Sequence, residues 1–296
     1  MTMIPMQVSK ASAGATTTYD PEEMDRINQE NLKELKSMRE RTNWEIEEER
    51  KQFIFDLIDL IKDWRWPLPN LHLEDILRKE EIHWLLTESM VGDLNYDGER
   101  IIDFVARTDY KDMPDVNEDG KPPSVRTTPV HHAFGHRKET WTIQYLFKIY
   151  DRFDVNYMDE FGLTHFHVAC VYGLGDVVEK FLELGQDPNC LVPETAQSPL
   201  HLALNHCSRQ VTELLLKYGA NPNLTDKNFS TPLHIICKIQ HSDVLANMLF
   251  ELANDKYEPV QVDAQNKFGN TPLNLTVVSD NKIVAELLLK KGVIRI

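Results

Sequence analysis

Apolar residues recur through the C-terminal two thirds of the chain in short stripes with helical spacing. Three of these stripes are Val177-Val178 with Phe181-Leu182, Val211 with Leu214-Leu215-Leu216, and Val284 with Leu287-Leu288-Leu289. Residues at i, i+3 and i+4 lie on one face of a helix, so each stripe predicts a short amphipathic helix with one buried face. Two stripes are followed by a glycine and an Asx-Pro-Asn turn, at residues 185–189 and 219–223. These turns end the helices and lead into the next element.

The N-terminal third has a different pattern. Asp20-Pro21-Glu22-Glu23 has the composition of a helix start, and neither glycine nor proline follows before Pro67, so the stretch to about Trp64 is predicted to be mostly helical. Its second half has an apolar stripe, which consists of Phe53, Leu57, Leu60, Ile61 and Trp64 and is widened by Phe55 and Ile58. Its first half is highly charged.

We interpret residues 20–79 as an N-terminal helical region whose apolar stripe packs on the first helical unit that follows and caps it. The alternative is a helix that binds a partner. For the charged half we expect a solvated helix or one that folds back on the rest of the chain. A dimeric coiled coil is the alternative, although no heptad is sustained there. Residues 1–19 are rich in Ser, Thr and Ala with little to bury, and are predicted to be disordered.

A four-residue phrase recurs at a nearly fixed interval, starting at residues 128, 164, 198, 231 and 271, so the spacings are 36, 34, 33 and 40 residues. The five copies read Thr128-Pro129-Val130-His131, Thr164-His165-Phe166-His167, Ser198-Pro199-Leu200-His201, Thr231-Pro232-Leu233-His234 and Thr271-Pro272-Leu273-Asn274. Ser or Thr suits a helix N-cap, and Pro suits the first helical position because its missing N–H costs nothing there. The phrase therefore predicts five helix starts.

A period near 33 with this phrase resembles the ankyrin repeat, whose motif is T-P-L-H-x-A. The resemblance implies an all-α ankyrin-repeat solenoid over residues 80–296, made of about six helix-turn-helix units with short hairpin turns. The units start near residues 80, 124, 160, 194, 227 and 267, and the N-terminal helical segment precedes them. Segments such as Leu60–Trp64 and Phe147–Asn156 are similar to the expanded ankyrin-repeat families of hymenopteran insects. Some of those proteins have an F-box-like module after the repeats, whereas this chain ends at Ile296.

Several copies depart from the motif. The glycine expected two residues before the phrase is present at Gly162 and Gly269, but Arg126, Ala196 and Phe229 replace it elsewhere. We expect altered turns at those three positions. His165 replaces proline in one copy and Asn274 replaces histidine in the last, and about seven extra residues at 254–261 predict a longer second helix or a longer loop.

Composition limits the class of partner. The formal net charge is −15, which argues against nucleic acid and anionic membrane surfaces and makes a protein partner with a basic patch the physical complement. There is no secretory signal and no apolar stretch of roughly 20 residues that could span a bilayer. We interpret the four cysteines, Cys170, Cys190, Cys207 and Cys237, as thiols in a reducing compartment, which predicts a cytoplasmic or nuclear location. We also expect the protein to be a monomer.

Candidate chemistry is weak. The histidines with metal-binding potential are His131, His132, His136, His165, His167, His201, His206 and His234. Four of them occupy one position of successive repeats, where an imidazole can bond to backbone and connect neighbouring units. Metal ligands must converge on one point, which stacked repeats do not allow, so we predict no metal and no cofactor. No nucleophile motif or phosphate-binding loop is present, so we predict no enzyme activity.

The remaining candidates lie on the surface. In ankyrin arrays partners contact the turn tips and the concave face of the first helices, so the resemblance implies those positions here. The tip candidates are Asp159, Glu160, Phe161, Lys227, Asn228, Phe229, Lys267 and Phe268; the inner-helix candidates are Val171, Tyr172, Asn205, His206, Lys238 and Gln240. The alternative for the three phenylalanines is burial between neighbouring turns. We predict a non-catalytic protein-interaction scaffold; the alternatives are a substrate adaptor of a ubiquitin ligase and an inhibitor that masks a basic segment of a transcription factor.

Overall fold

A computed structural model of the protein describes residues 21–62, 64, 71–92, 94, 96–113, 116, 120, 123, 125–134, 138–253 and 257–292. The predicted disorder of residues 1–19 lies outside these residues. The chain divides into two compact units, residues 1–71 and 72–296. The described residues are helical, with two isolated β-bridges and no extended strand among them. This is the all-helical fold class that the sequence predicts.

The described residues of the first unit form two helices, α1 (Pro21–Arg41) and α2 (Glu47–Lys62). The sequence predicts that this stretch is mostly helical, and in the structure a turn interrupts the helix at residues 42–46. Local side chains explain the break: the Thr42 hydroxyl donates to the Met38 carbonyl at 2.8 Å, and the Asn43 side-chain oxygen accepts the Glu45 N–H at 3.1 Å. Such bonds offer the backbone an alternative to helix.

The apolar stripe of α2 is only partly as predicted. Phe53, Ile54, Leu57 and Ile58 are buried, whereas Phe55 is 54% exposed and does not widen the buried stripe. The ring of Phe53 packs on Trp44 from the turn, with 5.1 Å between ring centroids. The capping role of this helix stays a prediction, and so does the solvated character of α1.

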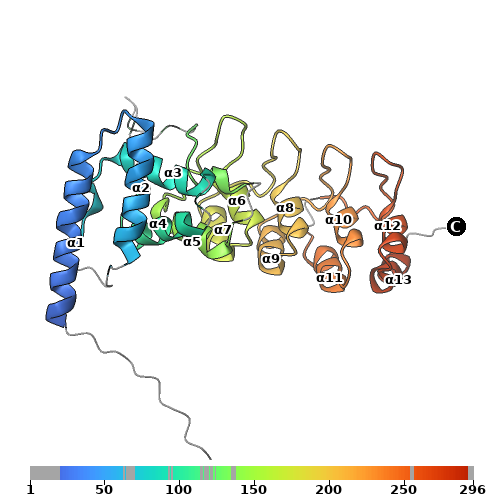
Figure 1. Ribbon diagram of the computed structural model, residues 1–296. Helices are drawn as coiled ribbons and strands as arrows, with labels where there is room; N and C mark the ends of the chain where they lie inside the picture. The colour runs from blue at the N-terminus through green and yellow to red at the C-terminus, as the bar shows by residue number, and fades with distance from the viewer. Residues whose placement is uncertain are drawn as a thin grey trace, which may run out of the picture. The chain divides into compact units, whose positions relative to one another are not determined.

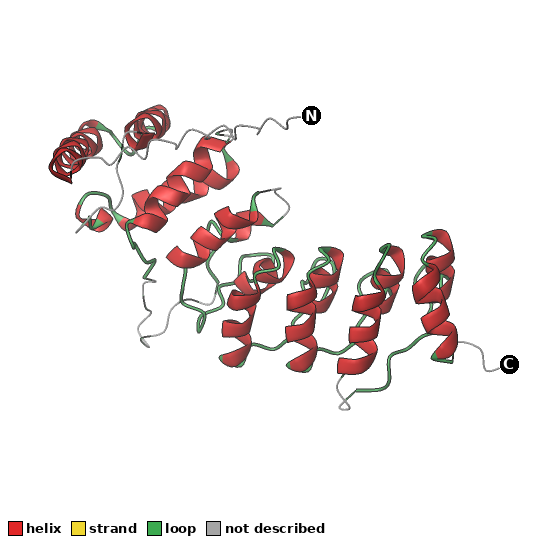
Figure 2. Cartoon of the chain, turned by 90° about the horizontal axis from the view of Figure 1, so that it is seen from below, coloured by secondary structure: helices red, strands yellow, loops and turns green. Residues whose placement is uncertain are grey.

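The second unit begins with a short 3₁₀ helix, η1 (Leu73–Asp75), and continues as six successive helical pairs. The pairs are α3 (Lys79–Val91) with α4 (Tyr96–Arg107), η2 (His131–Ala133) with α5 (Thr140–Ile149), α6 (His165–Val171) with α7 (Gly175–Glu183), α8 (Pro199–Asn205) with α9 (Arg209–Lys217), α10 (Pro232–Lys238) with α11 (Asp243–Leu252), and α12 (Pro272–Val278) with α13 (Lys282–Lys290). Helices α6, α8, α10 and α12 contact one another in one row, and α7, α9, α11 and α13 in a second row (Figures 1 and 2). The predicted unit boundaries stay a prediction.

Each phrase begins a helix in the way its residues allow. The hydroxyls of Thr164, Ser198, Thr231 and Thr271 accept the backbone N–H three residues later, and Pro199, Pro232 and Pro272 are the first helical residues. The exception is the phrase at Thr128, which yields only the three-residue 3₁₀ helix η2 in place of a seven-residue α-helix. The helix ends before Phe134, whose backbone is extended with φ of −69° and ψ of 120°.

Histidines at the fourth position of the phrase connect each pair to the next. The Nδ1 atom accepts the backbone N–H of the capping Thr or Ser, and the Nε2 atom donates to a carbonyl in the following unit. The bonds from Nε2 are His131 to Tyr157 at 3.1 Å, His167 to Cys190 at 3.1 Å, His201 to Ser230 at 3.0 Å and His234 to Asn270 at 3.1 Å. We call these four residues the bridging histidines. Because a backbone N–H can only donate and a carbonyl can only accept, the proton of each neutral ring is on Nε2.

The turns between pairs keep a left-handed backbone without glycine at two of the three altered positions. Gly162 and Gly269 have φ of 81° and 75°, and Ala196 and Phe229 occupy the same left-handed region at 54° and 57°. At Phe229 the turn also keeps its hydrogen bond to the residue three positions earlier, so the expectation of an altered turn is wrong there. At Ala196 the turn contains one more residue, because the Ala196 N–H donates to Val192, four positions earlier. At Arg126 the backbone is not left-handed, and its N–H donates to the Met158 carbonyl at 2.8 Å beside the isolated β-bridge between Val125 and Met158. The extra residues near 257–261 form a loop after α11.

Candidate functional site

The turn tips present three phenylalanines to solvent. Phe161 is 67% exposed, Phe229 58% and Phe268 73%, so none of them is buried between neighbouring turns. Glu160, Lys227, Asn228 and Lys267 are exposed beside them. The tips are joined by backbone bonds, since the N–H of Lys227 donates to Thr195 at 3.0 Å and that of Lys267 to Asn228 at 2.7 Å. These bonds join the last three turns into one continuous edge.

Asp159 differs from its prediction as a partner-binding residue. Its side chain is buried, and its carboxylate accepts the N–H groups of Phe161 at 2.9 Å and Leu163 at 2.8 Å. Asp226 and Asn266 do the same in their turns, each accepting two backbone N–H groups at 2.8 to 3.1 Å. Asp159 thus shapes the turn that presents Phe161.

The inner-helix candidates fall into two groups. Val171, Tyr172, Asn205 and His206 line one cavity of about 710 Å³ between the ends of α6 and α8. Lys238 and Gln240 are exposed at the end of α10, farther along the row. Sequence reasoning missed the other wall of this cavity, where Phe134, Lys138 and Gln197 lie. Phe134 and Lys138 follow the shortened helix η2, which the phrase alone did not reveal.

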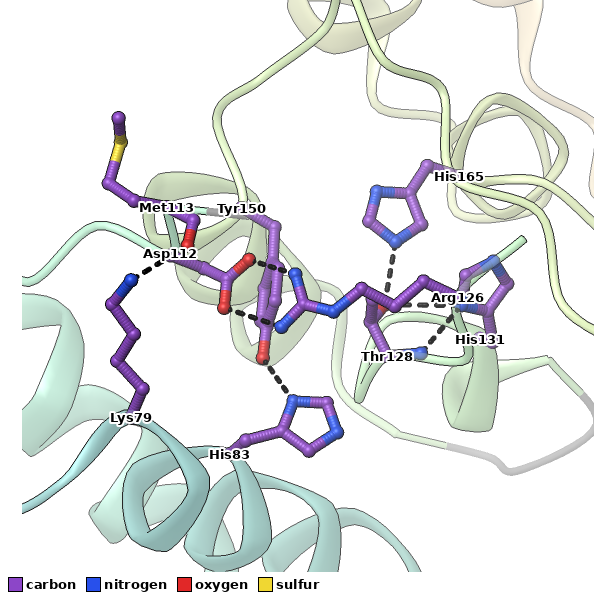
Figure 3. Close-up of polar contacts among 9 residues, drawn as sticks. All are labelled: Lys79, His83, Asp112, Met113, Arg126, Thr128, His131, Tyr150 and His165. Carbon is purple, nitrogen blue, oxygen red and sulfur yellow. Dashed lines mark hydrogen bonds and ion pairs between the residues drawn. The ribbon is translucent and has the colours of Figure 1, made fainter. Parts of the chain in front are cut away.

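A buried polar cluster lies between the first three pairs of the second unit (Figure 3). Arg126 forms a two-pronged ion pair with Asp112, whose side chain is only 5% exposed, and the guanidinium lies 5.4 Å from the centroid of the Tyr157 ring. Burial alone would lower the pKa of Arg126, but the hydrogen bond and charge of Asp112 outweigh it and raise that pKa. Burial also raises the pKa of Tyr110 to about 12, with a further contribution from Asp112.

The same cluster contains a chain of histidine contacts. The Thr128 hydroxyl lies 3.1 Å from Nδ1 of His131 and 2.6 Å from Nε2 of His165, while the Tyr150 hydroxyl lies 3.3 Å from Nδ1 of His83 (Figure 3). Burial lowers the pKa of His131 and, more strongly, that of His165. Burial disfavours the charged form of these rings, and their hydrogen bonds join neighbouring pairs.

The described residues contain neither a metal-ligand cluster nor a membrane-spanning helix. No group of three or more His, Cys, Asp or Glu side chains among them could hold a metal ion, and His136 lies outside them. Within those same residues, no helix has the length and apolar character that crossing a membrane would require. The four cysteines have free thiols: Cys170 and Cys237 are buried, Cys190 is half-buried and Cys207 is exposed.

Comparison with known proteins places this arrangement in a family. A family model described as "Ankyrin repeats (3 copies)" matches residues 131–226 and 200–295. Phosphocholine transferase AnkX of Legionella pneumophila is 35% identical over 130 residues, which are 43% of this chain and 13% of that protein. Human transient receptor potential cation channel subfamily A member 1 is 28% identical over 187 residues, 62% of this chain and 15% of the channel subunit. Human B-cell lymphoma 3 protein is 29% identical over 137 residues, 45% of this chain and 30% of that protein.

The likeness to these relatives is therefore confined to a minor part of their length, 13–30% of each protein. Matches to the repeat model extend from the second pair to the end of the sixth and cover more than half of the 296 residues. The matched residues contain the capped helix starts, the bridging histidines and the left-handed turns described above. The chain belongs to the ankyrin-repeat family.

Proposed function

We propose that the protein is a non-catalytic scaffold that binds another protein through its turn tips and inner helices. Ankyrin repeats indicate a protein–protein interaction module. The observation that supports the specific surface is the exposure of Phe161, Phe229 and Phe268 on three turns whose backbones are fixed by hydrogen bonds. Aromatic side chains are favoured anchors at interfaces, and a rigid turn loses little freedom when it binds.

A comparison of two triple variants tests this surface. The first replaces the three tip phenylalanines with alanine; the matched control truncates three other exposed apolar side chains, Leu184, Tyr218 and Ile283, which lie on or beside the second helices. Affinity capture with quantitative mass spectrometry should show partners that are lost from the tip variant and retained by the control. Retention of every partner by the tip variant, or equal loss from both, would contradict the proposed surface.

The net charge of −15 favours a partner with a basic patch, which is the requirement of the inhibitor alternative. If a basic segment is masked, neutralising that segment in a captured partner should abolish binding. The ligase-adaptor alternative requires instead that ligase subunits co-purify with the full chain. The free thiols support a reducing compartment, cytoplasmic or nuclear. We also propose a monomer, which light scattering can test, and a relation to the hymenopteran families stays a prediction.

A further inference from the structure

The cavity between the ends of α6 and α8 is a consequence of one irregular unit. Helices α6, α8, α10 and α12 each have seven residues, whereas η2 has three and ends at Ala133. Ala133 and Phe134 line one wall of the cavity, and Val171 and Tyr172 at the end of α6 line another. The Tyr172 hydroxyl donates to the Ala133 carbonyl at 2.9 Å and fixes the two walls together. The cavity is therefore built by the same departure that shortens η2.

The size and lining of the cavity suit part of a ligand. Its volume is about 710 Å³, which is within the range of roughly 300–1,000 Å³ found for ligand pockets. Phe134, Val171, Tyr172 and Leu202 supply apolar and aromatic surface. The polar lining consists of Lys138, Thr140, Gln197, Asn205 and His206.

The charge of the cavity is opposite to that of the chain. The protein has 47 acidic and 32 basic residues, yet among the described residues no Asp or Glu lines this cavity and Lys138 does. Lys138 is half-buried, and no ion pair within the described residues involves it. Burial lowers the pKa of His206, so its imidazole contributes a neutral N–H donor beside the Lys138 charge. The amide groups of Gln197 and Asn205 add further donors.

We propose that this cavity binds the carboxylate of an Asp or Glu side chain on an extended segment of the partner protein. The inference rests on the proposed function and specifies one anchor of that interface. Lys138 forms the ion pair, the neutral donors share the carboxylate oxygens, and Phe134 and Tyr172 pack against the stem of the anchor residue. A phosphorylated residue fits less well, because phosphate recognition favours several arginines and none of the described residues that line the cavity is an arginine.

The test uses random 12-residue peptides displayed on phage, selected against the immobilised full chain. Enriched sequences are synthesised with amidated C-termini, so that only side chains can supply the carboxylate. We expect Asp or Glu at one fixed position. Affinity should fall about tenfold or more when that residue becomes Asn or Gln, and likewise when Lys138→Glu replaces the wild-type protein. A peptide with Lys at the fixed position should recover binding to Lys138→Glu, because the charges are then exchanged.

Lys290→Glu is the matched control, since it makes the same charge change on an exposed residue of α13 and should leave affinity unchanged. Unaltered circular dichroism and thermal midpoint establish that Lys138→Glu is folded. Four outcomes overturn the inference. The selection enriches no peptide, or the enriched peptides share no acidic position. Lys138→Glu keeps the wild-type affinity or is not rescued by the peptide with Lys at that position, or binding requires a phosphate or a free C-terminal carboxylate on the peptide. Peptides that lack an acid but are lost with the triple tip variant overturn this inference and leave the proposed function standing.

Discussion

Replacing one bridging histidine should uncouple the helical pairs without disrupting either pair. His201 is suited to this test because it is fully buried near the middle of the row and its Nε2 donates to the Ser230 carbonyl at 3.0 Å. The chain contains its own template for the substitution. Asn274 occupies the same position in the last copy, where its side-chain oxygen accepts the Thr271 N–H at 2.9 Å. His201→Asn should therefore keep the bond to Ser198 and lose the bond to the next unit.

The cost can be worked from these contacts. A neutral intramolecular hydrogen bond contributes about 0.5–1.5 kcal/mol, and the smaller side chain leaves a cavity at a buried site, so we expect His201→Asn to lower the free energy of unfolding by about 2–3 kcal/mol. His201→Ala also leaves the buried Ser198 N–H without its acceptor, which adds about 1–3 kcal/mol. The order of stability should be wild type, His201→Asn, His201→Ala.

The positions of the tryptophans allow the uncoupling to be measured directly. All five, at residues 44, 64, 66, 84 and 141, precede His201, whereas helices lie on both sides of it. Urea unfolding followed by tryptophan fluorescence therefore reports the N-terminal side, and circular dichroism at 222 nm reports the whole chain. In a repeat array each unit is stabilised by its neighbours, so loss of one coupling should separate the two transitions.

The matched control is Asn274→His, at an exposed position whose side chain bonds only to Thr271 within the described residues. This substitution should change the free energy of unfolding by less than about 0.5 kcal/mol. Unchanged midpoints for His201→Asn would refute the coupling role of the histidine. Equal stability of the Asn and Ala variants would refute the bond to Ser198.

Acidification from about pH 7 to pH 5.5 should destabilise the protein. Burial holds the pKa of the bridging histidines below the ordinary 6.5, so the unfolded chain takes up protons that the folded chain does not. The free energy of unfolding should therefore fall by up to about 1.4 kcal/mol per pH unit for each histidine, and the urea midpoint should fall with it. The fall should be less steep in His201→Asn. A midpoint that holds or rises would contradict this assignment. Phe229→Gly should raise the free energy of unfolding by about 1 kcal/mol in urea titrations, because Phe229 has φ of 57°, whereas Phe268→Gly should not stabilise because Phe268 is not left-handed. Asp112→Asn should cost about 3 kcal/mol by leaving Arg126 without its buried partner, and apolar replacement of both residues should recover most of that loss in thermal melts. No recovery would argue against an uncompensated charge as the cause.

The sequence was most informative where one residue type has one local role. Ser or Thr followed by Pro predicted helix starts at residues 199, 232 and 272, and the structure has α8, α10 and α12 beginning there. The exposed tip phenylalanines were also reachable, because turn positions between two helices have no core to enter. Asp159 was misjudged although its equivalents Asp226 and Asn266 lie at the same place, and an acceptor that recurs at the start of a tight turn indicates backbone capping.

What could not be predicted depends on the failure of one helix to propagate. Thr128-Pro129-Val130-His131 satisfies every rule for initiation, yet η2 stops at Ala133, and only coordinates reveal that Phe134 and Lys138 then face the end of α6. The Asp112–Arg126 pair was equally hidden, because its members belong to irregular segments with no repeat register. The start of a helix depends on a few neighbouring residues and can be predicted from the sequence. The effect of a helix that ends early depends on the residues packed against it, which are distant in the sequence.

The bonds that stabilise the stack also fix the surface proposed to bind. The carbonyl that accepts from His201 belongs to Ser230, next to Phe229, and the one that accepts from His234 belongs to Asn270, two residues after Phe268. Each of these aromatic tips is thus connected to the inner helix of the preceding unit, and its turn is held by Asp226 or Asn266 from within. An exposed phenylalanine on a mobile loop would lose conformational entropy when it binds, whereas one on a turn fixed at two points has already lost it during folding. The histidine bonds therefore account for both the stability of the row and the rigid presentation of its apolar edge.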